Sequence, residues 1–144
     1  MLYRAMFESI EADSHLGLNI VVDVGQHDSY SVPRRILADC ALRLSGLPAW
    51  FIGMRCPLEV VLERRQATWG QSGTTDGSAP TPVRKWQEAV HEPGIYELEV
   101  DTSQMSPERC AEVIRQRLGR GPPSSAFHQL QQWRLSSSSV GIQS

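Results

Sequence analysis

The stretch Trp50-Phe-Ile-Gly-Met-Arg-Cys-Pro-Leu-Glu-Val-Val-Leu-Glu-Arg-Arg65 decides the fold of this chain. Its apolar opening, 50–54, predicts a short β-strand that is buried on both faces. Arg55 ends that strand, and Pro57 suits the first turn of a helix, where a missing N–H costs nothing. One buried helix face is predicted by apolar residues at positions i, i+3 and i+4: Leu58, Val61 and Leu62. A buried strand that leads into an amphipathic helix is typical of a βαβ unit.

The rest of the chain repeats this alternation of strand and helix. Strands are expected at 18–22, 50–54 and 95–101, the last with the strict alternation of a sheet edge. The first helix is expected at 2–16, and a second is expected to follow Ser31 as its cap, with Pro33 in its first turn. A third begins at Pro57, and a fourth covers 82–91 with Trp86 facing inward. The last follows a Ser106 cap and ends at Leu118. This order predicts an α/β fold, a three-layer parallel sheet with flanking helices.

Two segments differ in composition from these elements. A stretch rich in Gly, Ser and Thr covers about 66–82, and it predicts a lid loop between two helices. Residues 121–144 include four consecutive serines, Ser136–Ser139, and are expected to form a loose, low-complexity tail. The expected domain therefore spans residues 1–120.

Composition narrows the functional classes. The chain has 144 residues, 40% of them hydrophobic and 21% charged, which is the balance of one globular domain. The formal net charge of −2 and the absence of a basic tract give no reason to expect a nucleic-acid partner. No apolar run is long enough to span a bilayer, and the N-terminus lacks a signal-peptide core, so a cytoplasmic location without a membrane partner is expected. The three cysteines, Cys40, Cys56 and Cys110, are expected to be buried structural thiols.

Five blocks together resemble the chloramphenicol phosphotransferase family, P-loop kinases that act on small hydroxylated substrates. The blocks are Gly17-Leu-Asn-Ile-Val-Val-Asp23, Phe51-Ile-Gly-Met-Arg-Cys-Pro-Leu-Glu59, Glu63-Arg-Arg65, Val90-His-Glu-Pro-Gly94 and Tyr96-Glu-Leu-Glu-Val-Asp-Thr-Ser103. Their order and spacing fit over about residues 3–118. The resemblance implies ATP and Mg²⁺ as cofactors and a hydroxyl of a small molecule, such as chloramphenicol, as the phosphoryl acceptor.

One family feature is missing from the sequence. The chain contains no Gly-x-x-x-x-Gly-Lys-Ser/Thr motif, the loop that holds ATP phosphates in P-loop kinases. The resemblance implies that this loop, its strand and the catalytic Asp precede Met1, so the chain matches the C-terminal part of such a kinase. Because the missing strand would lie between 18–22 and 50–54, we expect either a gap there or direct pairing of those two strands.

The resemblance also assigns candidate site residues. Asp23 follows an apolar strand, as a Mg²⁺-binding Walker B acid does, although an Asp there also suits a turn or a helix cap. His27 and Asp28 share the next loop and are candidates for the substrate site, although a loop His is commonly just exposed. Among the nucleotide-binding candidates, Arg64 fits the family's lid arginines best, and the others are Arg65, Trp69 and Arg84. Trp69 suits either stacking on a base or a lid aromatic without a ligand, and Arg84 also suits a solvated helix face.

Three functions remain open on this sequence, one of them a different nucleotide-binding module that uses only the lid and the strand ends. The first is an ATP-dependent phosphotransferase that confers antibiotic modification or acts on a related alcohol, and that is inactive as this chain alone because phosphate positioning dominates phosphoryl transfer. The alternative is a non-catalytic remnant that is poorly folded or depends on a partner for the missing strand. Arg55 is expected either to close the ligand crevice at the strand ends or to pair with Asp101.

Overall fold

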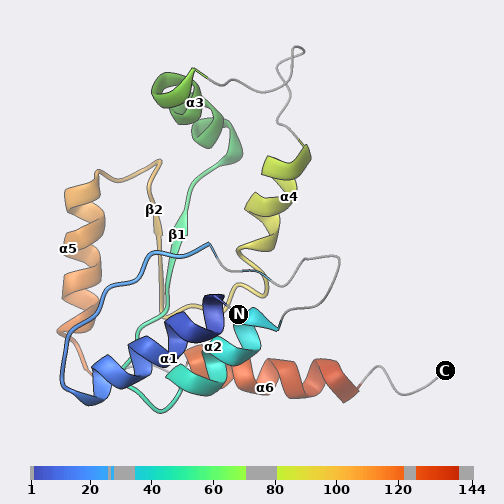
Figure 1. The fold of residues 1–144 in the computed structure, drawn as a ribbon. Helices are drawn as coiled ribbons and strands as arrows, with labels where there is room; N and C mark the ends of the chain where they lie inside the picture. Colours follow the sequence, from blue (N-terminus) through green and yellow to red (C-terminus); the bar gives the residue numbers. More distant parts are fainter. Residues whose placement is uncertain (1, 26, 28–34, 71–80, 122–125, 140–144) are drawn as a thin grey trace. The chain divides into compact units, whose positions relative to one another are not determined.

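The structure is a computed structural model that describes residues 2–25, 27, 35–70, 81–121 and 126–139 (Figure 1). Its elements in chain order are α1 (Leu2–His15), α2 (Ile36–Leu44), β1 (Ile52–Arg55), α3 (Leu58–Trp69), α4 (Thr81–Ala89), β2 (Leu98–Asp101), α5 (Pro107–Leu118) and α6 (Ala126–Ser139). The chain divides into two compact units, which are described separately below.

The first unit comprises 1–51, 95–97 and 122–144 and is helical. Its core is formed where α2 packs against both α1 and α6 (Figure 1). The buried side chains of this core are Phe7, Ile36, Cys40, Ala41, Leu44, Phe127 and Leu130. The ring of Phe51 stacks on that of Phe127, with 5.3 Å between their centroids. The apolar residues of α2 recur at helical spacing, and they are buried on one face of the helix.

Helix α6 corrects the expectation of a loose tail over Ala126–Ser139. Phe127 and Leu130 lie on one helix face and are 4% and 3% exposed, so their burial in the core stabilises the helix. The mostly polar composition of the segment did not predict this burial. Two hydrogen bonds with other parts of the unit hold its first turns. The Glu97 carboxylate accepts the N–H of Ala126 at 2.7 Å, and Gln131 donates to the Ala41 carbonyl at 3.1 Å.

The second unit comprises 52–94 and 98–121 and contains the sheet. Strands β1 and β2 pair in parallel, with Ile52 opposite Leu98 and Arg55 opposite Asp101 (Figure 1). Helix α5 packs on β2, where Val100 is 1% exposed. The predicted cap of α5 is confirmed, because the Ser106 hydroxyl accepts the N–H of Arg109 at 3.3 Å. This mixture of helices with a two-stranded parallel sheet is compatible with an α/β kinase-like fold.

The strand predicted at 18–22 is wrong. The structure describes this segment without strand hydrogen bonding, and Val21 is 98% exposed. Apolar, β-branched residues favour a strand only when a neighbouring strand receives their backbone groups. Within the described residues β1 pairs only with β2, so neither the direct pairing of 18–22 with 50–54 nor a larger sheet is present.

Other predicted boundaries also shift. The strand of 50–54 begins at Ile52, and Met54 is 48% exposed, so this strand is not buried on both faces. Helix α3 continues to Trp69 and ends where Gly70 adopts φ 64°, so residues 66–69, which were predicted to begin a lid loop, are helical. Trp86 on α4 is 49% exposed and does not face inward.

Two further findings complete the fold. Ser31 and Pro33, predicted at the start of α2, lie outside the described residues, and Arg35 with φ 55° directly precedes that helix. Among the helices that the structure describes, none has the length and hydropathy that a membrane span requires.

Replacing Phe127 by Ala tests whether α6 belongs to the core. We expect the free energy of unfolding to fall by about 3–5 kcal/mol, because the substitution removes a buried ring and leaves a cavity. Urea denaturation followed by circular dichroism measures this change. His128→Ala, at the exposed neighbouring position, is the matched control and should change stability little. Equal effects of the two substitutions would contradict the packing of α6.

Candidate functional site at the carboxyl ends of the strands

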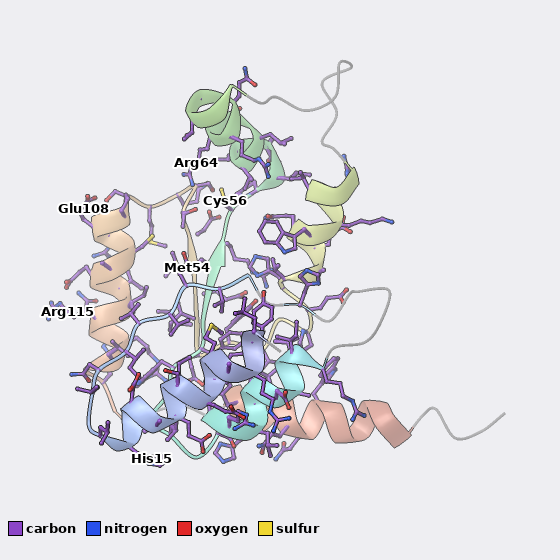
Figure 2. The ribbon with its side chains drawn as sticks, in the orientation of Figure 1. His15, Met54, Cys56, Arg64, Glu108 and Arg115 are labelled. Carbon is purple, nitrogen blue, oxygen red and sulfur yellow. The ribbon has the colours of Figure 1, made fainter. Side chains whose placement is uncertain are left out.

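The candidate site lies where β1 and β2 end side by side. Because the strands are parallel and Arg55 is opposite Asp101, β1 and β2 end at the same edge of the sheet. The chain continues from β1 through Cys56 into α3, and from β2 through Thr102 toward α5. Figure 2 shows Cys56 and Arg64 together at the end of β1, where α3 begins. This edge is where ligands of parallel sheets bind.

Thr102 joins the ends of the two strands. Its backbone N–H donates to the Arg55 carbonyl at 2.9 Å, and its hydroxyl donates to the same carbonyl at 3.2 Å. The first bond continues the parallel ladder by one residue, and the second adds a side-chain contact to it. Thr102 is therefore held in place by β1 before any ligand arrives.

Arg64, on α3, contacts Thr102 at the ends of the two strands. Its Nη2 donates to the Thr102 carbonyl at 2.6 Å, and its Nη1 donates to the Thr102 hydroxyl at 3.1 Å. Nη1 also lies 3.6 Å from Sγ of Cys56. A guanidinium carries five N–H donors in a rigid fork. Among the described contacts, its Nη1–Nη2 edge is occupied by Thr102, while the Nε–Nη2 edge of this exposed side chain is left for a ligand.

Helix α4 is fastened to the same turn. The side-chain amide of Gln87 donates to the Cys56 carbonyl at 2.7 Å, so Cys56 contacts α3 through its sulfur and α4 through its carbonyl. Both helices that flank the segment between residues 70 and 81 are thereby attached to the end of β1. Cys56 is half-buried and its thiol is free, whereas Cys40 and Cys110 are buried as expected of structural thiols.

Asp101 builds the turn that leaves β2. One of its carboxylate oxygens accepts both the N–H of Ser103 at 2.8 Å and the Ser103 hydroxyl at 2.6 Å. Its backbone carbonyl accepts the N–H groups of Gln104 and Met105. The hydrogen bonds from Ser103, first from its side chain and then from its backbone, lower the pKa of Asp101, because they stabilise the ionised carboxylate.

Arg55 does not pair with Asp101 as one expectation had it. Its Nε donates to the Glu99 carboxylate at 2.6 Å, because Arg55 and Glu99 lie diagonally across the two strands on one face. His91 lies close to this ion pair. Burial lowers the pKa of His91, the charge of Arg55 lowers it further, and Glu99 partly opposes both. A neutral imidazole is therefore favoured beside the ion pair.

The predicted site residues fall into both units. Asp23 is exposed and His27 is buried, and both belong to the first unit, while Asp28 lies outside the described residues. In the part of the chain that the structure describes, no cluster of three or more His, Cys, Asp or Glu side chains could hold a metal ion. The assignment of Asp23 to Mg²⁺ and of the two loop residues to substrate stays a prediction.

The nucleotide-binding candidates belong to the second unit. Arg64 lies at the strand ends as described, Arg65 follows it on α3, and Arg84 is exposed on α4. Trp69 ends α3, and its side chain lies outside the described part of the structure. Sequence reasoning did not select Thr102, although it directly follows the last strand and stands in a block that carried the family resemblance.

Replacing Ser103 by Ala tests the hydrogen bonds at the end of β2. We expect the pKa of Asp101 to rise toward its ordinary value, because the side-chain donor is lost. Carboxyl-detected NMR during a pH titration measures it. A carboxylate whose pKa is lower in the folded state than in the unfolded state stabilises the fold at pH values above the unfolded pKa. This stabilisation is lost as the pH falls through the folded pKa. In the Ser103→Ala variant, protonation of Asp101 should therefore lower the free energy of unfolding by less than it does in the wild type.

The matched control is Ser106→Ala, since the Ser106 hydroxyl lowers the pKa of Glu108 in the same way. This substitution should raise the pKa of Glu108 and leave that of Asp101 unchanged. If Asp101 titrates identically in wild type and in the Ser103 variant, the described turn is wrong.

A family model described as "Chloramphenicol phosphotransferase-like protein" matches residues 1–119. No curated protein and no solved structure matches the chain. The family match covers α1 through α5 and includes the strand ends that carry Arg64 and Thr102. It stops before α6. The chain belongs to the chloramphenicol phosphotransferase-like family.

Proposed function

We propose that this chain serves an ATP-dependent phosphotransferase whose acceptor is a hydroxyl group of a small molecule, chloramphenicol or a related alcohol. Family membership supports the reaction class. The observation that carries the nucleotide-binding part is Arg64, which stands at the carboxyl ends of parallel strands with one guanidinium edge left for an anion. That edge matches two oxygens of a phosphate group, because arginine binds oxyanions through two parallel N–H donors.

The residues present fit the implied cofactors to different degrees. ATP supplies the phosphoryl group and Mg²⁺ neutralises its charge when they are bound. Arg64 fits a phosphate, and Arg65 and Arg84 are further cations of the same unit. Asp23 is a single exposed carboxylate, which is compatible with Mg²⁺ because this ion keeps several waters and uses one or two protein carboxylates. His27 and Asp28 are the candidates for orienting the acceptor hydroxyl.

The sequence lacks the Gly-rich Lys-Ser/Thr loop, which binds the ATP phosphates in P-loop kinases. Its only lysine is Lys85, which follows Arg84 on α4 rather than a Gly-rich turn. Phosphoryl transfer depends on positioning and charge stabilisation, so a chain without the Gly-rich Lys-Ser/Thr loop is expected to bind nucleotide weakly and to transfer phosphate negligibly.

Nucleotide binding is tested by isothermal titration of the full chain with ATP and Mg²⁺. We expect weak binding that Arg64→Ala reduces by about tenfold or more, because a charge-assisted contact to phosphate is lost. Arg109→Ala removes the same charge from an exposed position on α5 and is the matched control. An equal loss in both variants, or no binding by the wild type, would contradict the nucleotide site.

Phosphoryl transfer is tested by incubating the chain with Mg-ATP and chloramphenicol and detecting the phosphate ester by mass spectrometry. We expect no product above background from this chain, because the phosphate-binding loop is absent from its sequence. Clear turnover would refute the inactivity and would require a phosphate-binding element other than the Gly-rich Lys-Ser/Thr loop.

The second candidate is a non-catalytic protein that needs a partner strand. The exposure of Leu18–Val22 favours it, because such an apolar segment gains both backbone hydrogen bonds and burial when a strand pairs with it. Hydrogen exchange of the amides at 18–22 and 50–54 tests this candidate. Rapid exchange at 18–22 agrees with this candidate, and strong protection of both segments in the monomer counts against it.

A further inference from the structure

We propose that Thr102 is a positioning residue that turns the Nε–Nη2 edge of Arg64 toward a nucleotide phosphate. This inference deepens the proposed function and depends on it. The contacts of Thr102 at the strand ends support it.

The first step is that Thr102 holds the guanidinium at two points. The carbonyl and the hydroxyl of Thr102 accept from Nη2 and Nη1 at 2.6 and 3.1 Å, so the guanidinium plane is fixed rather than free to rotate. The sulfur of Cys56, 3.6 Å from Nη1, occupies the remaining donor at that end. Of the five donors, the N–H of Nε and the second N–H of Nη2 remain, and they lie on one edge.

The second step is that Thr102 is itself anchored. Its N–H and its hydroxyl both donate to the Arg55 carbonyl, at 2.9 and 3.2 Å, which ties its position to the last residue of β1. The hydroxyl of Thr102 thus donates to one strand and accepts from the arginine. A hydroxyl can do both at once, because it has one donor and two acceptor lone pairs.

An exposed arginine side chain samples many rotamers, and ordering it on binding costs free energy. The Thr102 contacts select one arrangement in advance, so a phosphate that binds the remaining edge meets a prearranged donor pair.

The test compares ATP affinity of the full chain among wild type, Thr102→Val and Thr102→Ser, by isothermal titration with Mg²⁺. Valine keeps the shape of threonine and removes the hydroxyl, whereas serine keeps the hydroxyl. We expect Thr102→Val to bind ATP about three- to tenfold more weakly, since one hydrogen bond to the guanidinium is lost. Thr102→Ser should restore affinity close to wild type.

A double-mutant cycle with Arg64→Ala shows through which residue Thr102 acts. In the Arg64→Ala background, Thr102→Val should cause no further loss, because there is no guanidinium left to position. Thermal unfolding of each variant shows whether the fold is retained, and Thr102→Ser supplies the comparison if the valine variant is destabilised.

The outcomes separate the two proposals. If wild type binds ATP and Thr102→Val binds it equally well, the positioning role is wrong and the nucleotide site stands. If the valine variant loses the same factor in both backgrounds, Thr102 acts independently of Arg64 and the inference is overturned. If wild type binds no ATP while keeping its fold, the proposed function fails and the inference fails with it.

Discussion

The parallel pairing of β1 with β2 is the constraint on which the candidate site depends. Parallel strands in this register end at the same edge, so residues 47 positions apart in the sequence, Arg55 and Thr102, become hydrogen-bonded neighbours. Arg64 then meets Thr102 because α3 starts directly after β1. Without this register the guanidinium would have no acceptor pair at the sheet edge, and the arrangement that suits a phosphate would not exist.

A second source of order is the burial of α6. The family match ends at residue 119, yet Phe127 and Leu130 belong to the core of the first unit. Gln131 also contacts Ala41 and Ser45 at the end of α2. The core of this unit therefore includes residues that lie beyond the segment matched by the family. These residues cover the apolar face of α2, whose exposure to water would cost free energy.

Sequence patterns predicted features set by local chemistry and missed those set by distant contacts. The Ser106 cap was predictable because it depends on neighbours three residues away. The segment Leu18–Val22 has strand composition, but a strand exists only with a partner, and composition does not supply one. Phe127 sits in a polar context, so its burial depended on a core made elsewhere. Arg64 was predicted as a nucleotide contact, whereas its bond to Thr102 is tertiary and leaves no trace in spacing.

The exposure of Leu18–Val22 has a consequence for the protein in concentrated solution. The window contains β-branched side chains and no charge, and Val21 is 98% exposed. Segments of this kind pair with copies of themselves from other molecules and nucleate cross-β aggregates. Asp23 directly follows the window and opposes such stacking by charge repulsion, as gatekeeper residues do. Aggregation should therefore increase when that carboxylate is neutralised by acid and when the protein concentration rises.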